Sequence, residues 1–171
     1  MAGGVTGLKV VEVMDTKSLV WTTVASLPHP YSFAPGAIHG YKLYMLGGAD
    51  DQGMTKSVLT CSLTELLQSS SSSSIWHRVA DAPAYYSTCA AVNGELLAVG
   101  GCNKDWKPSS AIFKYNPTTN SWDLISIMPT ARWLSLIAVL PTNEIMVVGG
   151  SIKELDHGID TIEIANFTLH Y

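Results

Sequence analysis

Three short apolar runs that each end in a pair of glycines recur along the chain. They occupy residues 43–48, 96–101 and 145–150. Such a run is typical of a strand that is buried on both faces. Its glycines indicate a sharp turn or a close approach between backbones where the strand ends. We therefore expect three copies of one structural unit, each built around a central strand.

A second marker repeats in step with the glycine pairs. Trp21, Trp76 and Trp122 are followed at the same spacing by Pro28, Pro83 and Pro129. Two markers that recur together, at a period of about 50 residues, indicate a tandem-repeat protein. In such proteins each repeat buries its apolar face by packing on its neighbours.

Composition narrows the class of protein. The chain has 171 residues, of which 47% are hydrophobic, which suits one globular domain. The net charge of −4 and the lack of a Lys/Arg cluster argue against a nucleic-acid partner. Cys61, Cys89 and Cys102 have no C-x-x-C spacing, which favours reduced thiols in an intracellular protein. Because we find neither a signal peptide nor a stretch long enough to span a membrane, we expect a cytoplasmic protein without membrane contact.

The local patterns predict strands almost throughout. The expected strands are 8–13, 20–24, 34–38, 43–46, 57–62, 88–92, 96–99, 111–115, 136–140, 145–148 and 159–167, with another that Trp122 opens. Asn93 and Gly94 predict a two-residue hairpin turn. Residues 63–74 form an insertion that ends in serines, with a turn of helix expected at 64–67.

The second repeat carries a fuller pattern. Gly100 and Gly101 are followed by Tyr115, a polar turn, Trp122 and Pro129. This combination resembles the kelch motif. The first repeat lacks the tyrosine and turn because of its insertion, and the third lacks its tryptophan. The resemblance implies an all-β fold, a kelch-type β-propeller of four-stranded antiparallel blades around an axis, with the tryptophan packed between blades.

The expected organisation is a single kelch-repeat domain over residues 1–171. Residues 1–27 form a partial repeat that contributes an outer strand, 28–82 and 83–128 are repeats, and 129–171 is a repeat without its fourth strand. That makes about three blades, whereas kelch propellers usually have six or seven. Because the end blades would expose large apolar faces, we expect a homodimer that closes a six-bladed ring. An excised piece of a longer kelch chain is the alternative, and either 8–13 or 159–166 supplies the third strand of the joined blade.

Kelch propellers usually bind partners through the loops on one face. On these loops the expected partner-binding residues are Tyr31, Tyr86, Arg132, Trp133, Asp50, Asn103, Trp106 and Lys153. Tyr31, Tyr86 and Arg132 each stand three residues after a proline, which predicts equivalent positions around the ring. The two tyrosines can serve equally well to fill the mouth of the channel. Arg132 favours binding, because a buried unpaired arginine is costly.

The motifs give little indication of catalysis. The five histidines have no metal-ligand spacing, and no serine stands in a nucleophile elbow. Cys102 follows a glycine pair, and a buried small residue is a better interpretation than a reactive thiol. We expect a non-catalytic protein-interaction module that binds a protein or peptide, with no cofactor and no metal. The alternative is a kelch enzyme that acts on sugars or carries a copper-radical site.

Overall fold

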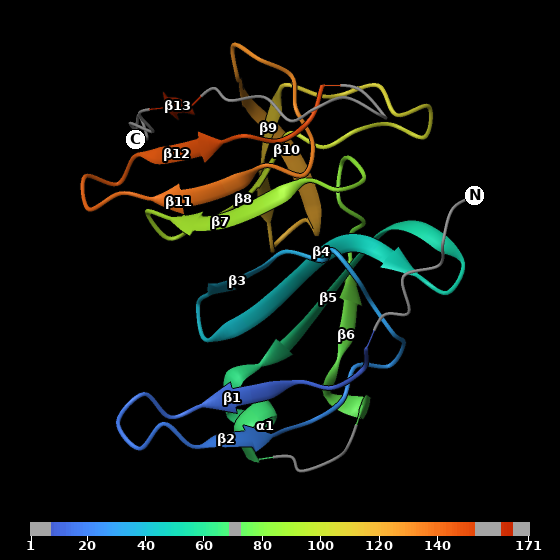
Figure 1. Cartoon of the computed structure of the whole chain (residues 1–171), viewed down its shortest axis with the longest axis vertical. Coiled ribbons are helices and arrows are strands. Elements are labelled where there is room, and N and C mark those ends of the chain that lie inside the picture. The colour runs from blue at the N-terminus through green and yellow to red at the C-terminus, as the bar shows by residue number, and fades with distance from the viewer. Residues whose placement is uncertain (1–7, 69–72, 153–161, 166–171) are drawn as a thin grey trace.

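The computed structural model describes residues 8–68, 73–152 and 162–165. Their strands form antiparallel sheets that succeed one another in chain order (Figure 1). The strands are β1 (Glu12–Met14), β2 (Trp21–Thr23), β3 (Gly36–His39), β4 (Lys42–Asp50), β5 (Gly53–Ser62), β6 (His77–Val79), β7 (Thr88–Val92), β8 (Glu95–Val99), β9 (Ala111–Asn116), β10 (Ser121–Ile127), β11 (Leu136–Val139), β12 (Ile145–Val148) and β13 (Ile162–Ala165). The predicted all-β class is confirmed.

Two of the sheets are complete four-stranded meanders. Sheet A has the strand order β3-β4-β5-β6, and sheet B has the order β7-β8-β9-β10. Sheet C contains β11, β12 and β13, and the N-terminal hairpin contains β1 and β2. β7 and β12 have the predicted bounds, and β6 was not among the predicted strands. Most of the others differ from the predictions by a few residues at their ends, and residues 159–161 and 166–167 of the last predicted strand lie outside the described residues.

One glycine pair does not end its strand, contrary to expectation. β4 continues through Gly47 and Gly48 to Asp50, with a shift of register between Leu46 and Gly48. A bulge of this kind lets the strand bend without losing its partner. Glycine is needed because a Cβ on Gly48 would lie 2.4 Å from the carbonyl oxygen of Ser32. The close approach was predicted correctly, but not the continuing strand.

The insertion in the first repeat forms the helix α1 (Leu63–Gln68), which extends the predicted turn. The side chain of Leu66 is buried, and the 3₁₀ helix η1 (Ser73–Ile75) leads from the insertion into β6. Residues 69–72 of the serine tract lie outside the described residues. In the described segments, neither helix is long enough to cross a membrane.

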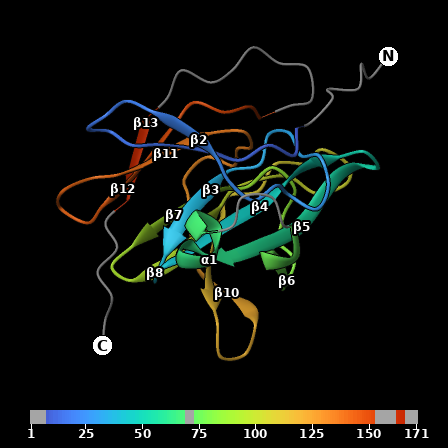
Figure 2. The ribbon, with the colours of Figure 1, turned by 90° about the horizontal axis from the view of Figure 1, so that it is seen from below.

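The sheets pack face to face through three buried clusters. One lies between the hairpin and sheet A and includes Val24, Leu59, Cys61 and Trp76. The second joins sheet A to sheet B, and the third joins sheet B to sheet C. β3, β7 and β11 are the first strands of their sheets, and β7 packs against both of the others (Figures 1 and 2). Each sheet therefore covers one side of the next.

Candidate binding face

Isolated bridges define which residues of the repeats are equivalent. They pair Ser32 with Ala49, Tyr85 with Cys102, and Trp133 with Ser151. Ala49, Cys102 and Ser151 each directly follow a glycine pair, so their bridge partners occupy one repeated position. The next residue in each repeat is left-handed: φ is 54° at Phe33, 51° at Tyr86 and 52° at Leu134. Phe33, Tyr86 and Leu134 are therefore the equivalent set.

The predicted equivalence of Tyr31, Tyr86 and Arg132 is consequently wrong. The left-handed residue stands three positions after the proline in the second repeat, but five positions after it in the other two. Spacing from proline misaligned the repeats because the connection in the second repeat is shorter. The bridge after each glycine pair is the reliable reference, since it is fixed by backbone contact.

The equivalent residues surround a shallow pocket of about 270 Å³ at the start of β3, β7 and β11. Its lining residues are Phe33, Ala34, Pro35, Tyr86, Ser87, Thr88, Leu134 and Ser135. Phe33 and Leu134 are largely exposed, and Tyr86 is half-buried. The Oγ atom of Ser135 is buried and has no hydrogen-bond partner among the described residues. The pocket thus has an apolar rim and at least one polar group in its wall.

Four rings form a continuous group beside this pocket, which we call the aromatic patch: Phe33, Tyr86, Trp106 and Trp133. The Tyr86 ring lies 5.9 Å from Trp106, 5.7 Å from Trp133 and 6.4 Å from Phe33, between ring centroids. Trp106 and Trp133 are 5.1 Å apart. Burial raises the pKa of the Tyr86 hydroxyl, with a smaller contribution from Cys102, so the ring stays neutral at physiological pH. The structure therefore brings together three predicted residues, Tyr86, Trp106 and Trp133.

The loop between β8 and β9 positions Trp106. The Oδ1 atom of Asn103 accepts hydrogen bonds from the backbone N–H groups of Asp105 (2.9 Å) and Lys107 (3.0 Å). The backbone N–H of Trp106 donates to the carbonyl oxygen of Asn103 at 3.1 Å, and Trp106 is itself left-handed with φ of 59°. The oxygen of the Asn103 side chain thus holds the loop together, which is a structural role beside the binding role that we predicted.

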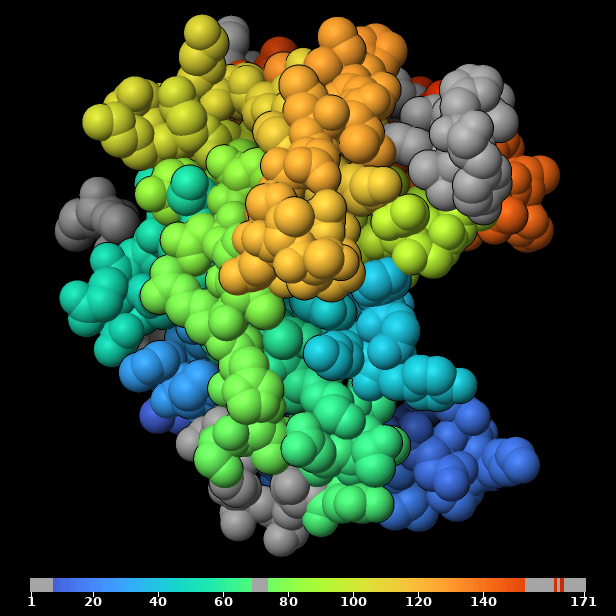
Figure 3. Space-filling model, turned by 180° about the vertical axis from the view of Figure 1, so that it is seen from behind, coloured from blue at the N-terminus to red at the C-terminus, as the bar shows by residue number. Residues whose placement is uncertain are grey.

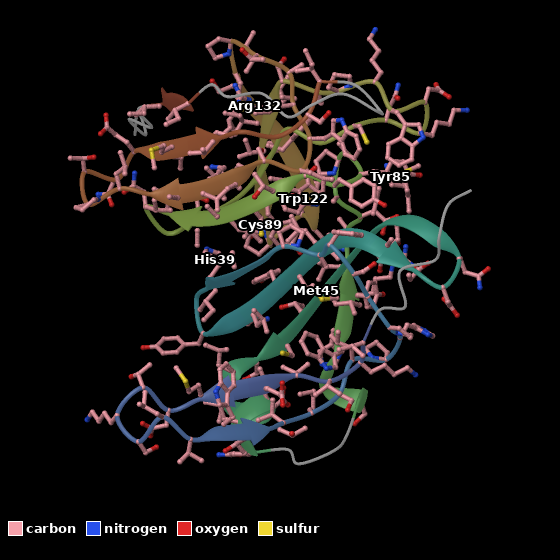
Figure 4. The ribbon with its side chains drawn as sticks, viewed as in Figure 1. His39, Met45, Tyr85, Cys89, Trp122 and Arg132 are labelled. Carbon is pink, nitrogen blue, oxygen red and sulfur yellow. The ribbon has the colours of Figure 1, made fainter. Side chains whose placement is uncertain are left out.

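Arg132 is fully buried, which corrects the expectation that it meets a partner. Its Nη1 atom donates to the carbonyl oxygen of Gly149 at 2.8 Å. Its own carbonyl oxygen accepts from the N–H of Gly101 at 2.9 Å, and a Cβ on Gly100 would lie 2.4 Å from that oxygen. Arg132, which Figure 4 labels, therefore ties sheet B to sheet C. The sequence did not reveal this because both contacts are made with backbone groups, the carbonyl of Gly149 and the N–H of Gly101.

Other predicted residues line pockets outside the patch. Tyr31 and Asp50 line a separate pocket of about 520 Å³ beside the hairpin, together with Trp76 and Arg78. Asn103 lines the corresponding pocket of sheet B, of about 260 Å³. Lys153 lies outside the described residues. The described members of the predicted set are thus divided among the aromatic patch, two other pockets and the buried position of Arg132. The sequence analysis missed Phe33 and Leu134, which line the pocket beside the patch.

Within residues 8–68, 73–152 and 162–165, no group of three or more His, Cys, Asp or Glu side chains is placed to hold a metal ion. The three cysteines are free and buried, and burial raises the pKa of the Cys102 thiol to about 11. The thiol therefore stays protonated and poorly nucleophilic at neutral pH, as the sequence favoured.

Antiparallel sheets of up to four strands, each packed on the next, resemble the blades of a β-propeller. Residues 83–129 match the family model described as Kelch motif, and they contain the whole of sheet B. The match covers one repeat of the chain, and it supports the resemblance to the kelch motif that the pattern around Trp122 predicted. No curated protein matches the chain.

Proposed function

We propose that this chain is a non-catalytic protein-interaction module that binds a protein or peptide through the aromatic patch and the pocket beside it. The observation that carries the proposal is the convergence of Phe33, Tyr86 and Leu134. These residues come from three different sheets and occupy the same repeat position, at one end of the first strands. Kelch repeats generally serve as interaction modules, which agrees with this assignment.

The chemistry of the patch suits a partner with an apolar anchor. Aromatic side chains dominate the binding energy of many interfaces when they lie at the centre of a contact. Tyr86 and Trp106 are half-buried, so their orientation is fixed before binding and little side-chain entropy is lost. Trp133 lies beneath them, is buried and supports both rings. Arg132 acts as a positioning residue, because it holds the two sheets that carry these rings.

The proposal is tested by Tyr86→Asn and Trp106→Asn in the full chain. Asparagine tolerates the left-handed backbone of both positions, so the substitution removes the ring with little added strain. The matched control is Tyr41→Asn, since Tyr41 is also left-handed, is highly exposed and lies in the turn at the opposite end of β3. All three variants are first compared with the parent chain by thermal unfolding.

The tagged variants then capture proteins from a cell lysate, and recovery is quantified by mass spectrometry. We expect at least one protein that the parent and Tyr41→Asn recover equally, and that both patch variants recover at least tenfold less. Equal recovery by all four chains would place any partner elsewhere on the molecule. Recovery that depends on Tyr41 and not on Tyr86 would reverse the assignment of the face.

A further inference from the structure

Equivalent residues are buried in sheets A and B but exposed in sheet C. The strand registers pair Leu46 with Val58, Val99 with Ile112, and Val148 with Ile162. Val58, Ile112 and Ile162 therefore occupy one repeated position, on the side of each sheet that faces the next sheet along the chain. Val58 is fully buried and Ile112 is 1% exposed, whereas Ile162 is 61% exposed. The difference is that, in the part of the chain that the structure describes, no further sheet lies on this side of sheet C.

The rest of this face of sheet C is also apolar. Leu136 and Ile164 alternate onto it from the two flanking strands, and both are largely exposed. Met146 and Val148 of β12 lie between them and are half-exposed. A face of this kind, continuous with the packing between the other sheets, is suited to bury another sheet.

The other end of the stack is covered only in part. The hairpin packs on the outer strands of sheet A, where Leu59 and Cys61 are buried against it. Over the first strand of sheet A nothing comparable is present among the described residues, and Ile38 is 59% exposed. β1 and β2 thus cover sheet A in the way that the third and fourth strands of a preceding sheet would. The first and second strands of such a sheet would lie over β3, and among the described residues this place is open.

We propose that a second copy of this chain supplies those two strands. β11 and β12 of the second copy take the open place on sheet A of the first copy. β1 and β2 of the first copy then add to these two strands as the third and fourth strands of one sheet. One chain holds both halves of this sheet at opposite ends of its stack, so the halves meet between chains (Figure 1). The same junction forms twice about a two-fold axis, which closes a ring of six four-stranded sheets.

In this arrangement β1 replaces β13 of the other copy as the third strand. The hairpin is the better anchored of the two: the backbone N–H of Val24 donates to Val11 at 2.9 Å, and that of Leu27 donates to Lys9 at 2.8 Å. Val11 and Val13 also pack into the buried cluster against sheet A. By contrast, Ile162 and Ile164 of β13 face solvent. These contacts favour β1 over β13 as the third strand of the joined sheet, a choice that the sequence left open.

The register of sheet B predicts which residues meet across the junction. In sheet B, Leu97 pairs with Lys114, the residue before Tyr115, and Tyr115 pairs with Trp122. In the hairpin, Met14 pairs with Trp21, so Val13 corresponds to Lys114. Met146 corresponds to Leu97. Met146 of one copy should therefore stand opposite Val13 of the other.

The test is a disulfide between chains. Val13→Cys with Met146→Cys is made in a Cys61→Ala background, which removes the native thiol of the cluster beside Val13. We expect the double variant to run as a disulfide-linked dimer after mild oxidation, and each single variant to remain unlinked. The proposal is overturned if the double variant is a dimer but forms no disulfide between its chains, or if a single variant becomes linked.

A surface variant tests the same junction without new thiols. Leu136→Lys places a charge on the bare face of sheet C, and Leu124→Lys is the matched control on β10, since both leucines are about equally exposed at 61% and 60%. We expect Leu136→Lys to raise the dimer dissociation constant at least a hundredfold and Leu124→Lys to leave it unchanged. Equal dissociation constants, or a parent chain that is monomeric throughout, would contradict the proposal. Neither test touches the aromatic patch, so the two proposals fail separately.

Discussion

The junction between sheets A and B and the junction between the hairpin and sheet A use the same repeat positions in different ways. At the outer edge of the first junction, the Oδ1 atom of Asn120 accepts from the Tyr115 hydroxyl at 2.9 Å and from the N–H of Ala80 at 2.8 Å. The indole Nε1 of Trp122 donates to the carbonyl oxygen of Ala80 at 3.2 Å. Figure 3 shows β10 lying directly against the segment that leaves β6.

The second junction is held by packing. The register of β5 and β6 brings Trp76 beside Cys61, where sheet B has Trp122 and Tyr115. The Nε1 atom of Trp76 is buried and has no hydrogen-bond partner among the described residues. Instead, Leu66 from α1 joins Val24 and Leu27 in the cluster around Trp76. The insertion thus takes the place of the polar turn and supplies a helix. The apolar face of this helix seals the second junction, where the first junction has hydrogen bonds.

The comparison teaches that a repeat preserves the packing of sheet on sheet more strictly than the interactions at the edge. A buried side chain and a hydrogen-bonded turn both exclude water from the junction, although their energies have different origins. The segment with the hydrogen-bonded edge is also the one that matches the kelch family model.

The largest expected effect concerns the packed junction. Leu66→Ala removes a side chain that is only 3% exposed and should lower the free energy of unfolding by about 2–5 kcal/mol. Leu67→Ala is the control on the same helix, because Leu67 is 60% exposed, and it should change stability by no more than about 0.5 kcal/mol. Urea unfolding measures both. Equal effects would mean that α1 does not seal this junction.

The next effect concerns the hydrogen-bonded junction. Asn120→Ala leaves the Tyr115 hydroxyl and the Ala80 N–H without their acceptor and should cost about 1–3 kcal/mol. Because Asn120 is left-handed with φ of 51°, part of that loss is backbone strain, which Asn120→Gly removes. Asn120→Asp keeps the acceptor and should remain close to the parent. If the glycine variant recovers full stability, the hydrogen bonds contribute nothing.

A smaller effect separates the two tryptophans. Trp122→Phe loses the hydrogen bond to Ala80, whereas Trp76→Phe removes an N–H group that has no partner among the described residues. Beyond the loss of ring volume, which both share, Trp122→Phe should cost about 0.5–1.5 kcal/mol more in hydrogen bonding. The free energy of unfolding of each Phe variant is compared with that of the Leu variant at the same position, because leucine removes the N–H group and the ring together. The comparison would be contradicted if the Trp76→Phe variant lost more stability through hydrogen bonding than the Trp122→Phe variant.

The smallest expected effect on stability at neutral pH concerns two buried thiols, one in each junction. Burial raises the pKa of Cys89 to about 12, and burial together with Glu65 raises that of Cys61 to about 11. The unfolded chain releases these protons near pH 8.5, so the folded state binds more protons above that pH and its stability falls as pH rises. Stability is unaffected below it. Cys89→Ala and Cys61→Ala should each flatten the decline between pH 9 and 10.5, and unchanged slopes would contradict the assigned burial.

Much of the fold was predictable because each repeat needs glycine at positions where two backbone segments approach closely, and these glycines are visible in the sequence. Gly101 must be glycine, since a Cβ there would lie 2.6 Å from the carbonyl oxygen of Tyr85, and the same contact recurs at the other glycine pairs. Strands that alternate or run apolar between such glycines were located to within a few residues. The bulge that carries β4 past Gly48 was not predicted, because it depends on pairing with β5.

The candidate site was predictable only in part. Tyr86, Trp106 and Trp133 were chosen as loop aromatics, and the structure brings them together. Phe33 was missed because proline spacing aligned Tyr31 in its place. Arg132 was expected at the surface because the acceptor of its side chain, the backbone carbonyl of Gly149, has no signature in the sequence. Errors of this kind arise wherever tertiary contact, and not local pattern, decides exposure.

Equilibrium sedimentation of the intact chain tests most directly whether stacked sheets of this kind need covering on both sides. The closed ring predicts a particle of twice 18.4 kDa at micromolar concentration, with a monomer appearing only on dilution. A single species of 18.4 kDa at every concentration would contradict it, because the apolar face of sheet C would then be stable in water.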